Sequence, residues 1–424
     1  MTVQTKKVAV IGFGNVGAGV IDLLLRKEAP GLELSKVVVK HPGKPRPFNI
    51  PPHLITTDLT QVIHNPEIDI VVDLTGDTEL GKTLALQALQ KGKDVVTSNK
   101  VLITEYGSEI FGLASKLNQY VGFRGTFVGC HSLIHELSLA RVATKRIKKL
   151  RAILNGTCNY ILSAMTKEGK SFQEALGEAQ ERGYAERDPS EDIDGIDTAR
   201  KLRILLGLIN NSFKTPPAFP VEGIRGVPLQ DIQYARELGY RIKLLGIIER
   251  GEDCSYVSVH PTLVPQDSML GSVEGVNNAI EIEDEYGIVS GLIAPGAGTY
   301  PTATAVVKDL LDIASGEKSL MPDREEEIAL GDIGDISSRY YLRLGVVDQP
   351  GVLAQISSIF AKHDISIAAV IQKESISKDF VPIVMTLHRT KERSVVTAMK
   401  EIDRLSIVKA KTQIIRMLDS EIKT

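Results

Sequence analysis

Acidic residues and a lysine gather between positions 183 and 201, and their types suit proton transfer. Asp197 and Lys201 are four residues apart in a segment with helical spacing, so they share one face of a helix. Asp192 and Asp194 lie near the start of this segment, and Glu186 precedes it. Hydride transfer at an alcohol or carbonyl needs a group that exchanges the hydroxyl proton and groups that bind the rest of the substrate. From spacing alone, a surface salt bridge between Asp197 and Lys201 is the simpler explanation.

A glycine motif near the N-terminus suits a dinucleotide. Gly12-Phe13-Gly14-Asn15-Val16-Gly17 follows a strand-like run at 7–11 and opens an amphipathic segment at 15–26. In such a turn the first glycine permits the bend, the second lets a pyrophosphate approach the backbone, and the third lets helix and strand pack closely. The helix N-terminus offers free N–H groups to the phosphates. The flanking strand and helix favour dinucleotide binding over the alternative, a glycine-rich turn without a ligand.

The end of the second expected strand, at 37–39, bears on the choice of cofactor. An NAD site usually has an acidic residue here, which accepts hydrogen bonds from the ribose 2′-hydroxyl. This sequence instead continues with Lys40-His41, followed by Lys44 and Arg46, and has no carboxylate there. The cluster favours a 2′-phosphate, so we expect NADP(H) to be preferred, with NAD(H) possible. A solvated basic loop is the alternative.

The segments that must position these residues predict three folded parts. Strand-like runs at 68–74 and 94–97 alternate with a helical stretch at 80–90, which implies a parallel sheet covered on both faces. The middle of the chain is mixed α+β, with strands near 150–154 and 243–248 and helices near 172–182 and 194–209. After an acidic segment at 317–335, residues 339–417 read strand, helix, strand, strand, helix, strand, the order of a ferredoxin-like domain.

We therefore predict an α/β protein whose first domain is of the Rossmann type. The expected boundaries are 1–130 for the dinucleotide-binding domain, with 300–316 returning to it, and 131–316 for a substrate and dimerisation domain. A linker over 317–337 then leads to the ferredoxin-like domain over 338–424.

Composition excludes other classes of protein. The formal net charge of −3 argues against a broadly basic nucleic-acid binder. The three cysteines, Cys130, Cys158 and Cys254, are too scattered for a disulfide framework, and we expect the first two to be buried small residues. His131 and His135 have no further ligand nearby, so we predict no metal site. No apolar run reaches the length of about eighteen residues that spans a bilayer, so we expect a cytoplasmic protein.

Several long motifs resemble homoserine dehydrogenases. Val95-Val96-Thr97-Ser98-Asn99-Lys100 is similar to a strand end of that family. Gly296-Ala297-Gly298-x-x-Pro301-Thr302 is similar to its late glycine turn. Three more motifs match in the family's order: Leu154-Asn155-Gly156-Thr157-Cys158-Asn159-Tyr160-Ile161-Leu162, Ala179-Gln180-x-x-Gly183-Tyr184-Ala185-Glu186-x-Asp188-Pro189 and Asp192-Ile193-Asp194-Gly195-Ile196-Asp197-Thr198-Ala199-Arg200-Lys201.

The resemblance implies a reversible, NAD(P)-dependent interconversion of L-aspartate 4-semialdehyde and L-homoserine in threonine and methionine biosynthesis. It implies that Lys201 and Lys100 flank the reacting oxygen and that Asp197 orients Lys201. It further implies that Glu186 and Asp192 hold the substrate's ammonium group. The other residues that it implies are Asn155, Gly156, Thr157 and Tyr184 for the substrate, and Thr75, Gly76, Ser98, Asn99 and Gly298 beside Lys40 and the glycine motif for the cofactor.

One stretch, residues 123–132, departs from the family pattern. Where the family has a glutamate that helps to bind a monovalent cation, this chain has Arg124, whose charge repels a cation. We therefore expect no sodium site, and we expect Arg124 to pair with Glu186, with another carboxylate or with the substrate's carboxylate. The departure keeps two alternatives open: a dehydrogenase of another small amino or hydroxy acid, and a catalytically silent regulator that binds an amino acid and a nucleotide.

The C-terminal segment resembles an ACT domain, from its first strand at 340–347 through the turn Asp348-Gln349-Pro350-Gly351-Val352-Leu353 to the helix that follows. The resemblance implies edge-to-edge pairing of copies and binding of an amino-acid effector, with threonine expected. We expect a homodimer or homotetramer, and a purely dimerising module is the alternative. The candidate effector residues are Asp348, Pro350, Gly351, Val352 and Leu353.

Overall fold

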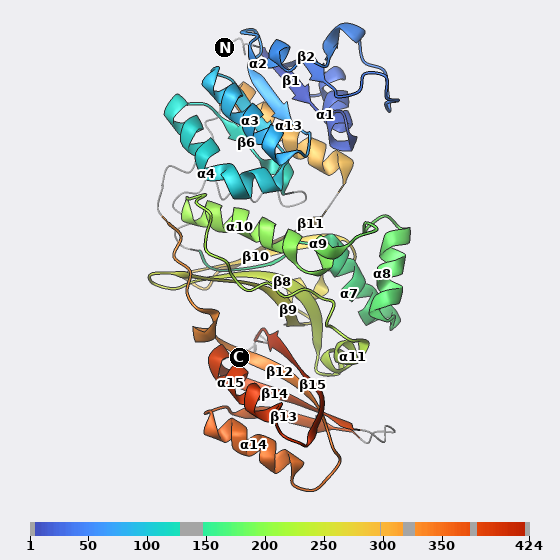
Figure 1. Cartoon of the computed structure of the whole chain (residues 1–424), viewed down its shortest axis with the longest axis vertical. Coiled ribbons are helices and arrows are strands. Elements are labelled where there is room, and N and C mark those ends of the chain that lie inside the picture. Colours follow the sequence, from blue (N-terminus) through green and yellow to red (C-terminus); the bar gives the residue numbers. More distant parts are fainter. Residues whose placement is uncertain (1–4, 128–146, 297, 317–326, 374–379, 420–424) are drawn as a thin grey trace. The chain divides into compact units, whose positions relative to one another are not determined.

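The computed structural model describes residues 5–127, 147–296, 298–316, 327–373 and 380–419, and Figure 1 colours them in chain order. The chain forms two compact units. The first unit consists of Met1–Lys148, Arg200–Pro217 and Ile282–Ala329, and the second of Lys149–Ala199, Ala218–Glu281 and Leu330–Thr424.

A six-stranded sheet forms the centre of the first unit, with the strand order β3-β2-β1-β4-β5-β6. Neighbouring strands are parallel, and Asp73 pairs with Ile11 on one side and Thr97 on the other. The carboxyl ends of β1, β4 and β5 therefore lie side by side at one edge of the sheet, where the strand order reverses. The strands are β1 (Lys6–Ile11), β2 (Leu32–Val38), β3 (Ile55–Thr56), β4 (Ile70–Asp73), β5 (Asp94–Thr97) and β6 (Val121–Gly122).

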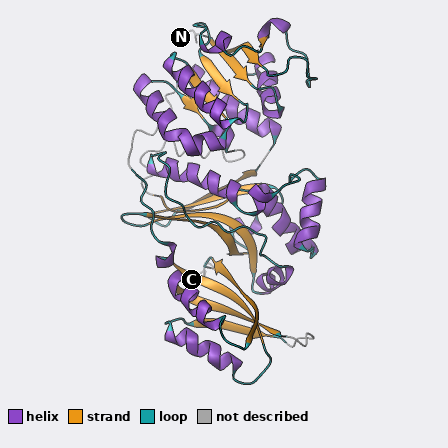
Figure 2. Ribbon diagram, in the orientation of Figure 1, coloured by secondary structure: helices purple, strands orange, loops and turns teal. Residues whose placement is uncertain are grey.

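Helices cover both faces of this sheet, as predicted (Figure 2). On one face, Val8 and Val10 of β1 are buried in a core with Val20 and Ile21 of α1 and Val306 of α13. The alternating side chains of the parallel strands thus each meet a helix. The helices are α1 (Asn15–Leu25), α2 (Thr60–Ile63), α3 (Thr78–Gln90), α4 (Lys100–Leu117) and α13 (Thr299–Ser315), with short 3₁₀ turns η1 (Pro52–Leu54) and η2 (Arg124–Thr126).

A mixed nine-stranded sheet has the order β11-β10-β7-β8-β9-β15-β12-β14-β13. The predicted strands near 150 and 243 are β7 and β8, and the predicted helices near 172 and 194 are α8 and α10. The predictions did not include β9, β10 or β11. The elements of the middle of the chain are β7 (Ile147–Ile153), α7 (Gly156–Glu168), α8 (Phe172–Glu181), α9 (Ser190–Ile193), α10 (Ile196–Asn210), α11 (Leu229–Glu237), β8 (Tyr240–Arg250), β9 (Ser255–Pro265), α12 (Met269–Ser272), β10 (Asn277–Asp284) and β11 (Val289–Pro295).

The C-terminal part of this sheet has the predicted ferredoxin-like order of elements. Its own core combines Tyr340 and Leu342 with Ile356, Phe360 and Val395, all fully buried. The strand β15 at its edge pairs with β9 of the same chain, a junction that the sequence analysis did not predict. The elements are η3 (Ile333–Asp335), β12 (Ser337–Val346), α14 (Val352–Lys362), β13 (Ile367–Gln372), β14 (Val381–Lys391), α15 (Glu392–Ile402) and β15 (Val408–Met417).

Candidate active site

The glycine motif forms the turn between β1 and α1 that a dinucleotide needs. Gly12 has φ 107°, and a Cβ there would lie 2.6 Å from the carbonyl oxygen of Leu74. A Cβ on Gly17 would lie 2.2 Å from the carbonyl oxygen of Gly12, so strand and helix pack too closely for any side chain. Gly14 is different, because a Cβ there would meet no atom within 4 Å. The fold itself does not fill the space beside Gly14, which fits a pyrophosphate that approaches the backbone at this position.

The ends of β4 and β5 carry four more of the predicted cofactor residues. Thr75 follows β4 and donates its hydroxyl to Asp73 Oδ1 at 2.7 Å. Burial raises the pKa of Asp73, although hydrogen bonds from Thr75 counteract this shift. Asn99 caps α4 by accepting a hydrogen bond from the backbone N–H of Leu102 at 3.0 Å, which places Lys100 at the first position of that helix. Ser98 lies between Asn99 and β5, and Gly76 has φ 74°.

The basic loop after β2 is folded back on the glycine motif. The guanidinium of Arg46 lies 5.4 Å from the centre of the Phe13 ring, which is the second residue of the motif. Arg46 also donates to the carbonyl oxygens of Pro42 at 2.6 Å and His41 at 2.9 Å. Lys40 is exposed at the start of this loop. The sequence analysis named Arg46 as part of the basic cluster but missed its contact with Phe13.

A second group of predicted residues meets around the side chain of Asn155. Asn155 precedes α7 and caps it by accepting a hydrogen bond from the backbone N–H of Cys158 at 2.8 Å. Its amide nitrogen donates to Asp192 at 2.7 Å and to Asp197 at 3.0 Å. Two carboxylates that are far from Asn155 in sequence are thereby held together. Lys201 lies one turn after Asp197 on α10.

The burial of Asp197 and Lys201 bears on the surface salt bridge as an explanation of their spacing. Their residues are only 7% and 8% exposed, so they are not a surface salt bridge. An ionisable pair is seldom buried to this extent without a structural or functional reason. Cys158 is also fully buried, as predicted, and its thiol donates to the carbonyl oxygen of Asp192 at 3.2 Å.

The motif between α8 and α9 packs beside the start of α7. Thr157 donates its hydroxyl to the carbonyl oxygen of Tyr184 at 2.7 Å. Gln180 donates its side-chain amide to the carbonyl oxygen of Glu186 at 3.0 Å. These bonds fix the backbone that carries Glu186, while its side chain remains exposed. Gly156 allows close packing here, since a Cβ would lie 2.7 Å from the carbonyl oxygen of Val276.

Arg124 pairs with carboxylates of α13, which was one of its three expected types of partner. Its guanidinium donates to Asp309 at 2.9 Å and forms an ion pair with Asp312. Its backbone N–H donates to the second oxygen of Asp309, also at 2.9 Å. The arginine therefore ties α13 to the end of the parallel sheet.

Four residues considered in the sequence analysis, Cys130, His131, Ser132 and His135, lie outside the described residues.

In the C-terminal domain, the expected turn leads into α14 at Gly351, which has φ 90°, while Val352 is buried and Leu353 is exposed. Asp348 and Pro350 belong to this turn. In the described part of the chain, no cluster of three histidine, cysteine or acidic residues has the geometry of a metal site. No helix of the described residues is long and apolar enough to cross a membrane.

Comparison with known proteins covers nearly the whole chain. Residues 133–311 match the family model described as homoserine dehydrogenase, 12–124 match its NAD binding domain, and 340–406 match the ACT domain. The homoserine dehydrogenase of Pseudomonas aeruginosa is 36% identical, with 94% of this chain and 95% of that protein covered. The Synechocystis enzyme of the same name is 37% identical, with 98% of this chain and 100% of that protein covered.

Solved structures give the same result. The crystal structure of a homoserine dehydrogenase from Thiobacillus denitrificans superposes with a TM-score of 0.87 at 36% identity, covering 98% of this chain and 99% of that one. A hyperthermophilic archaeal homoserine dehydrogenase in complex with NADPH superposes with a TM-score of 0.61 at 26% identity, covering 75% of this chain and 100% of that one.

Proposed function

The chain belongs to the homoserine dehydrogenase family, and from this premise we propose that it interconverts L-aspartate 4-semialdehyde and L-homoserine, with NADP(H) as the preferred cofactor. The observation that carries the proposal is the bonding of Asn155 to both Asp192 and Asp197, with Lys201 one helical turn further on. This arrangement offers an amine for proton transfer together with carboxylates for an ammonium group. The reaction places the protein in threonine and methionine biosynthesis.

Reduction of the aldehyde adds a hydride to its carbon and a proton to its oxygen. A reduced nicotinamide, when bound, supplies the hydride. We assign the proton to the ammonium of Lys201, and Lys100 to the second position beside the reacting oxygen. Asp197 orients Lys201 from the preceding turn of α10. In the oxidative direction the amine of Lys201 takes the hydroxyl proton back.

The carboxylates of Asp192 and Glu186 bind the substrate's ammonium group in this proposal. Asp192 is held by the amide of Asn155, which orients one of its oxygens. The backbone that carries the Glu186 side chain is fixed by the hydrogen bonds that the carbonyl oxygens of Tyr184 and Glu186 accept. The position of the carboxylates is thus set by neutral donors and by the start of α7.

The preference for NADP(H) is supported by the loop after β2. No carboxylate follows this strand, and Arg46 lies over Phe13 within the glycine motif itself. Lys40 and Arg46 can therefore meet a 2′-phosphate beside the turn that binds the pyrophosphate.

Cofactor titrations test this preference. We expect NADPH to bind more tightly than NADH, and Lys40→Glu and Arg46→Glu each to weaken NADPH binding roughly tenfold while NADH binding changes little. Lys116→Glu, an exposed lysine on α4, is the matched control. Equal dissociation constants of the two reduced cofactors for the unmodified protein would contradict the preference.

A direct assay tests the reaction itself. The absorbance of reduced nicotinamide is followed with L-homoserine and NADP⁺, and with other small hydroxy amino acids in its place. Turnover of homoserine supports the proposal, whereas turnover of another alcohol alone favours a different substrate. Binding of cofactor and amino acid without turnover favours a silent regulator.

The C-terminal domain extends the proposal to regulation and assembly. We propose that an amino-acid effector, with threonine as the candidate, binds where the turn at 348–351 opens α14, because a helix N-terminus suits a carboxylate. We further propose a homodimer or homotetramer in the cytoplasm. Inhibition of the assay by threonine, and light scattering of the full chain, test these two points.

A further inference from the structure

The C-terminal domain and segment 220–225 use the same edge of β9. The segment pairs first, through an isolated parallel bridge between Val221 and Val259. Glu222 N–H donates to the carbonyl oxygen of Val259 at 2.7 Å. Three residues further along β9, Thr262 pairs with Arg416 of β15. The segment and the C-terminal strand are therefore neighbours on one strand edge.

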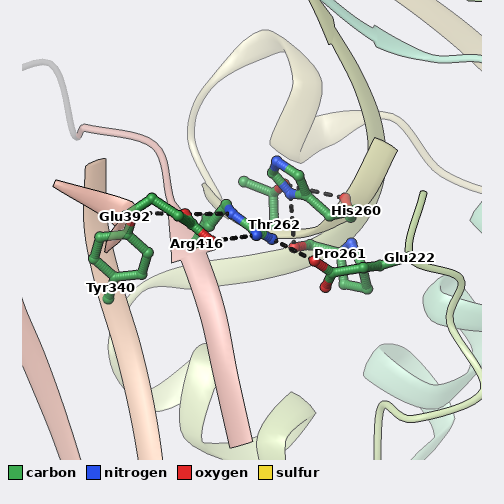
Figure 3. A network of polar contacts seen from close by, with 7 residues as sticks. All are labelled: Glu222, His260, Pro261, Thr262, Tyr340, Glu392 and Arg416. Atoms are coloured by element: carbon green, nitrogen blue, oxygen red, sulfur yellow. Dashed lines mark hydrogen bonds and ion pairs between the residues drawn. The ribbon is translucent and has the colours of Figure 1, made fainter. Parts of the chain in front are cut away.

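Arg416 joins these two neighbours through its guanidinium (Figure 3). On one side it makes two hydrogen bonds with Glu392 at the start of α15, which also accepts the hydroxyl of Tyr340 at 2.7 Å. On the other side its Nη1 donates to Glu222 at 3.0 Å. One side chain thus bonds a carboxylate of the C-terminal domain and a carboxylate of segment 220–225.

His260 adds no competing charge at this junction. It is fully buried, and burial together with the nearby Arg416 lowers its pKa well below the ordinary value of a histidine. Its Nδ1 is hydrogen-bonded to the hydroxyl of Thr262 at 2.9 Å (Figure 3). The charge that faces Glu222 and Glu392 is therefore that of Arg416.

Segment 220–225 leads from this junction to the backbone around Asp192. A Cβ on Gly223 would lie 2.1 Å from the carbonyl oxygen of Ile193, so the two backbones are in direct contact. Ile224 N–H donates to the same oxygen at 2.8 Å. Arg225 forms an ion pair with Asp194 and donates to the hydroxyl of Ser190 at 2.9 Å. The segment thus contacts residues on both sides of Asp192.

From these contacts we infer that Arg416 and Glu222 are positioning residues, which set the place of Asp192 through segment 220–225. The inference rests on the proposed function, in which Asp192 binds the substrate's ammonium group. A shift of the C-terminal domain that moves Arg416 is carried to the carboxylate of Asp192 within one chain. The connection is a short series of hydrogen bonds and close backbone contacts. A regulatory domain can use this connection to change substrate affinity.

Enzyme kinetics on the full-length protein test the positioning role. The variants are Glu222→Gln, Arg416→Gln, the conservative Arg416→Lys and the double variant. We expect the first two to raise the KM for homoserine roughly fivefold, near the low end of measured coupling effects, with kcat and NADP⁺ affinity unchanged. Because both act through one contact, the double variant should show no larger effect than the stronger single variant. Arg416→Lys should raise the KM for homoserine less than Arg416→Gln does.

The matched control is Arg389→Gln. Arg389 lies on β14 of the same domain, and its ion pair with Asp419 stays within that domain. Its KM should equal that of the unmodified protein. A rise in this control equal to that of Arg416→Gln would show that any lost ion pair in the domain has the effect, and would overturn the inference.

Hydrogen–deuterium exchange separates this inference from the proposed function. In Glu222→Gln and Arg416→Gln, amides of 190–197 and 220–225 should exchange faster, while those of α4 do not change. Unchanged exchange in both segments would overturn the inference, whatever the substrate. Faster exchange in a protein that does not turn over homoserine would reject the proposed function and leave the connection standing.

Discussion

Arg124 in the first unit and Arg416 in the second are alike in their chemistry and differ in what they connect. Both side chains are mostly buried, with 7% and 14% exposed, and both lie between two carboxylates. Two carboxylates that pair with Arg124 among the described residues belong to a single helix, α13. Those of Arg416 belong to α15 and to segment 220–225. One arginine ties a helix to its own sheet, and the other joins two separate parts of the chain.

Because of this difference, we expect loss of the Arg124 contacts to affect stability and loss of the Arg416–Glu222 contact to affect function. A buried ion pair inside one folding unit leaves an uncompensated charge when one partner is removed, so its loss is felt in the free energy of unfolding. The contact between Arg416 and Glu222 involves a glutamate whose side chain is half exposed. Solvent screens such a pair, so its loss should cost little stability and act mainly through geometry.

Lys201 provides the reference for effects on chemistry, because neither arginine is assigned to proton transfer. We expect Lys201→Ala to lower kcat by about two to four orders of magnitude, the range typical of lost acid–base catalysis, with cofactor affinity nearly intact. Lys201→Arg keeps a charge at this position but cannot exchange the proton at neutral pH, so it should be almost as slow. Steady-state kinetics and cofactor titration check both variants. If Lys201→Ala keeps more than half of its turnover, the lysine is not the proton carrier.

Arg124→Met should produce the largest loss of stability among the arginine variants. It leaves Asp309 buried without its guanidinium partner, which typically costs about 3–5 kcal/mol. Burial already raises the pKa of Asp309 to about 7. The charge of Arg124 opposes this shift, so its removal raises the folded pKa of Asp309 further. A protein with such a carboxyl loses stability as pH rises from the unfolded to the folded pKa, and this loss continues to higher pH in the variant. The deficit should therefore be larger at about pH 8 than at about pH 6. Denaturant titrations at both values measure it.

Two further variants sharpen this test. Arg124→Met combined with Asp309→Leu should recover much of the stability, because the fully buried carboxylate is then removed together with its guanidinium, and Asp312, which also loses this guanidinium, is 20% exposed. Arg26→Met is the control for an exposed ion pair, since Arg26 pairs with Asp22 at the surface of α1. If Arg124→Met instead raised KM and left stability unchanged, the distinction between the two arginines would fail.

Local patterns in the sequence predicted the order of strands and helices better than the partners of the two arginines. The glycine motif, the alternating strands and helices and the ferredoxin-like order depend on residues close in sequence, and the structure confirms them. The two carboxylates of α13 that pair with Arg124 are 185 and 188 positions away, and Glu222 is 194 positions from Arg416, and no periodicity marks these pairs. The need for glycine at 223 is equally hidden, because it arises from the backbone of Ile193.

The candidate site shows the same division. The family motifs identified Asn155, Asp192 and Asp197 as separate candidates, and only the fold shows that one amide holds both carboxylates. The pairing of β15 with β9 depends on two strand edges that meet after folding. Neither edge carries a sequence signal for its partner, since strand pairing uses backbone groups that every residue except proline has in full.

A third buried cation, Lys243 on β8, tests whether the kind of partner decides how a buried charge behaves. Neutral oxygens accept its hydrogen bonds, the side-chain oxygen of Asn159 at 3.0 Å and the carbonyl oxygen of Val273. Burial is the main cause that lowers the pKa of Lys243 to about 8; the nearby charge of Glu274 opposes this shift, and those of Arg241 and Lys167 add to it. The carboxylate-paired arginines keep their charge at every pH of interest.

The sign of the expected pH dependence follows from this shift. Below the folded pKa, Lys243 is charged in both the folded and unfolded states, and the full cost of burying the charge is present. As pH rises from about 8 toward the unfolded value of 10.5, the folded state loses its proton first and the cost disappears. Relative to Lys243→Met, the unmodified protein should therefore gain roughly 1–2 kcal/mol between about pH 7 and about pH 9.5. Denaturant titrations of both proteins measure the gain, and Lys116→Met, at an exposed position, should show none. Parallel pH profiles of the two proteins would contradict this prediction. They would mean that Asn159 and Val273 stabilise the ammonium group to the same extent as carboxylates stabilise the two arginines. The charge of the partner would then not distinguish these buried cations.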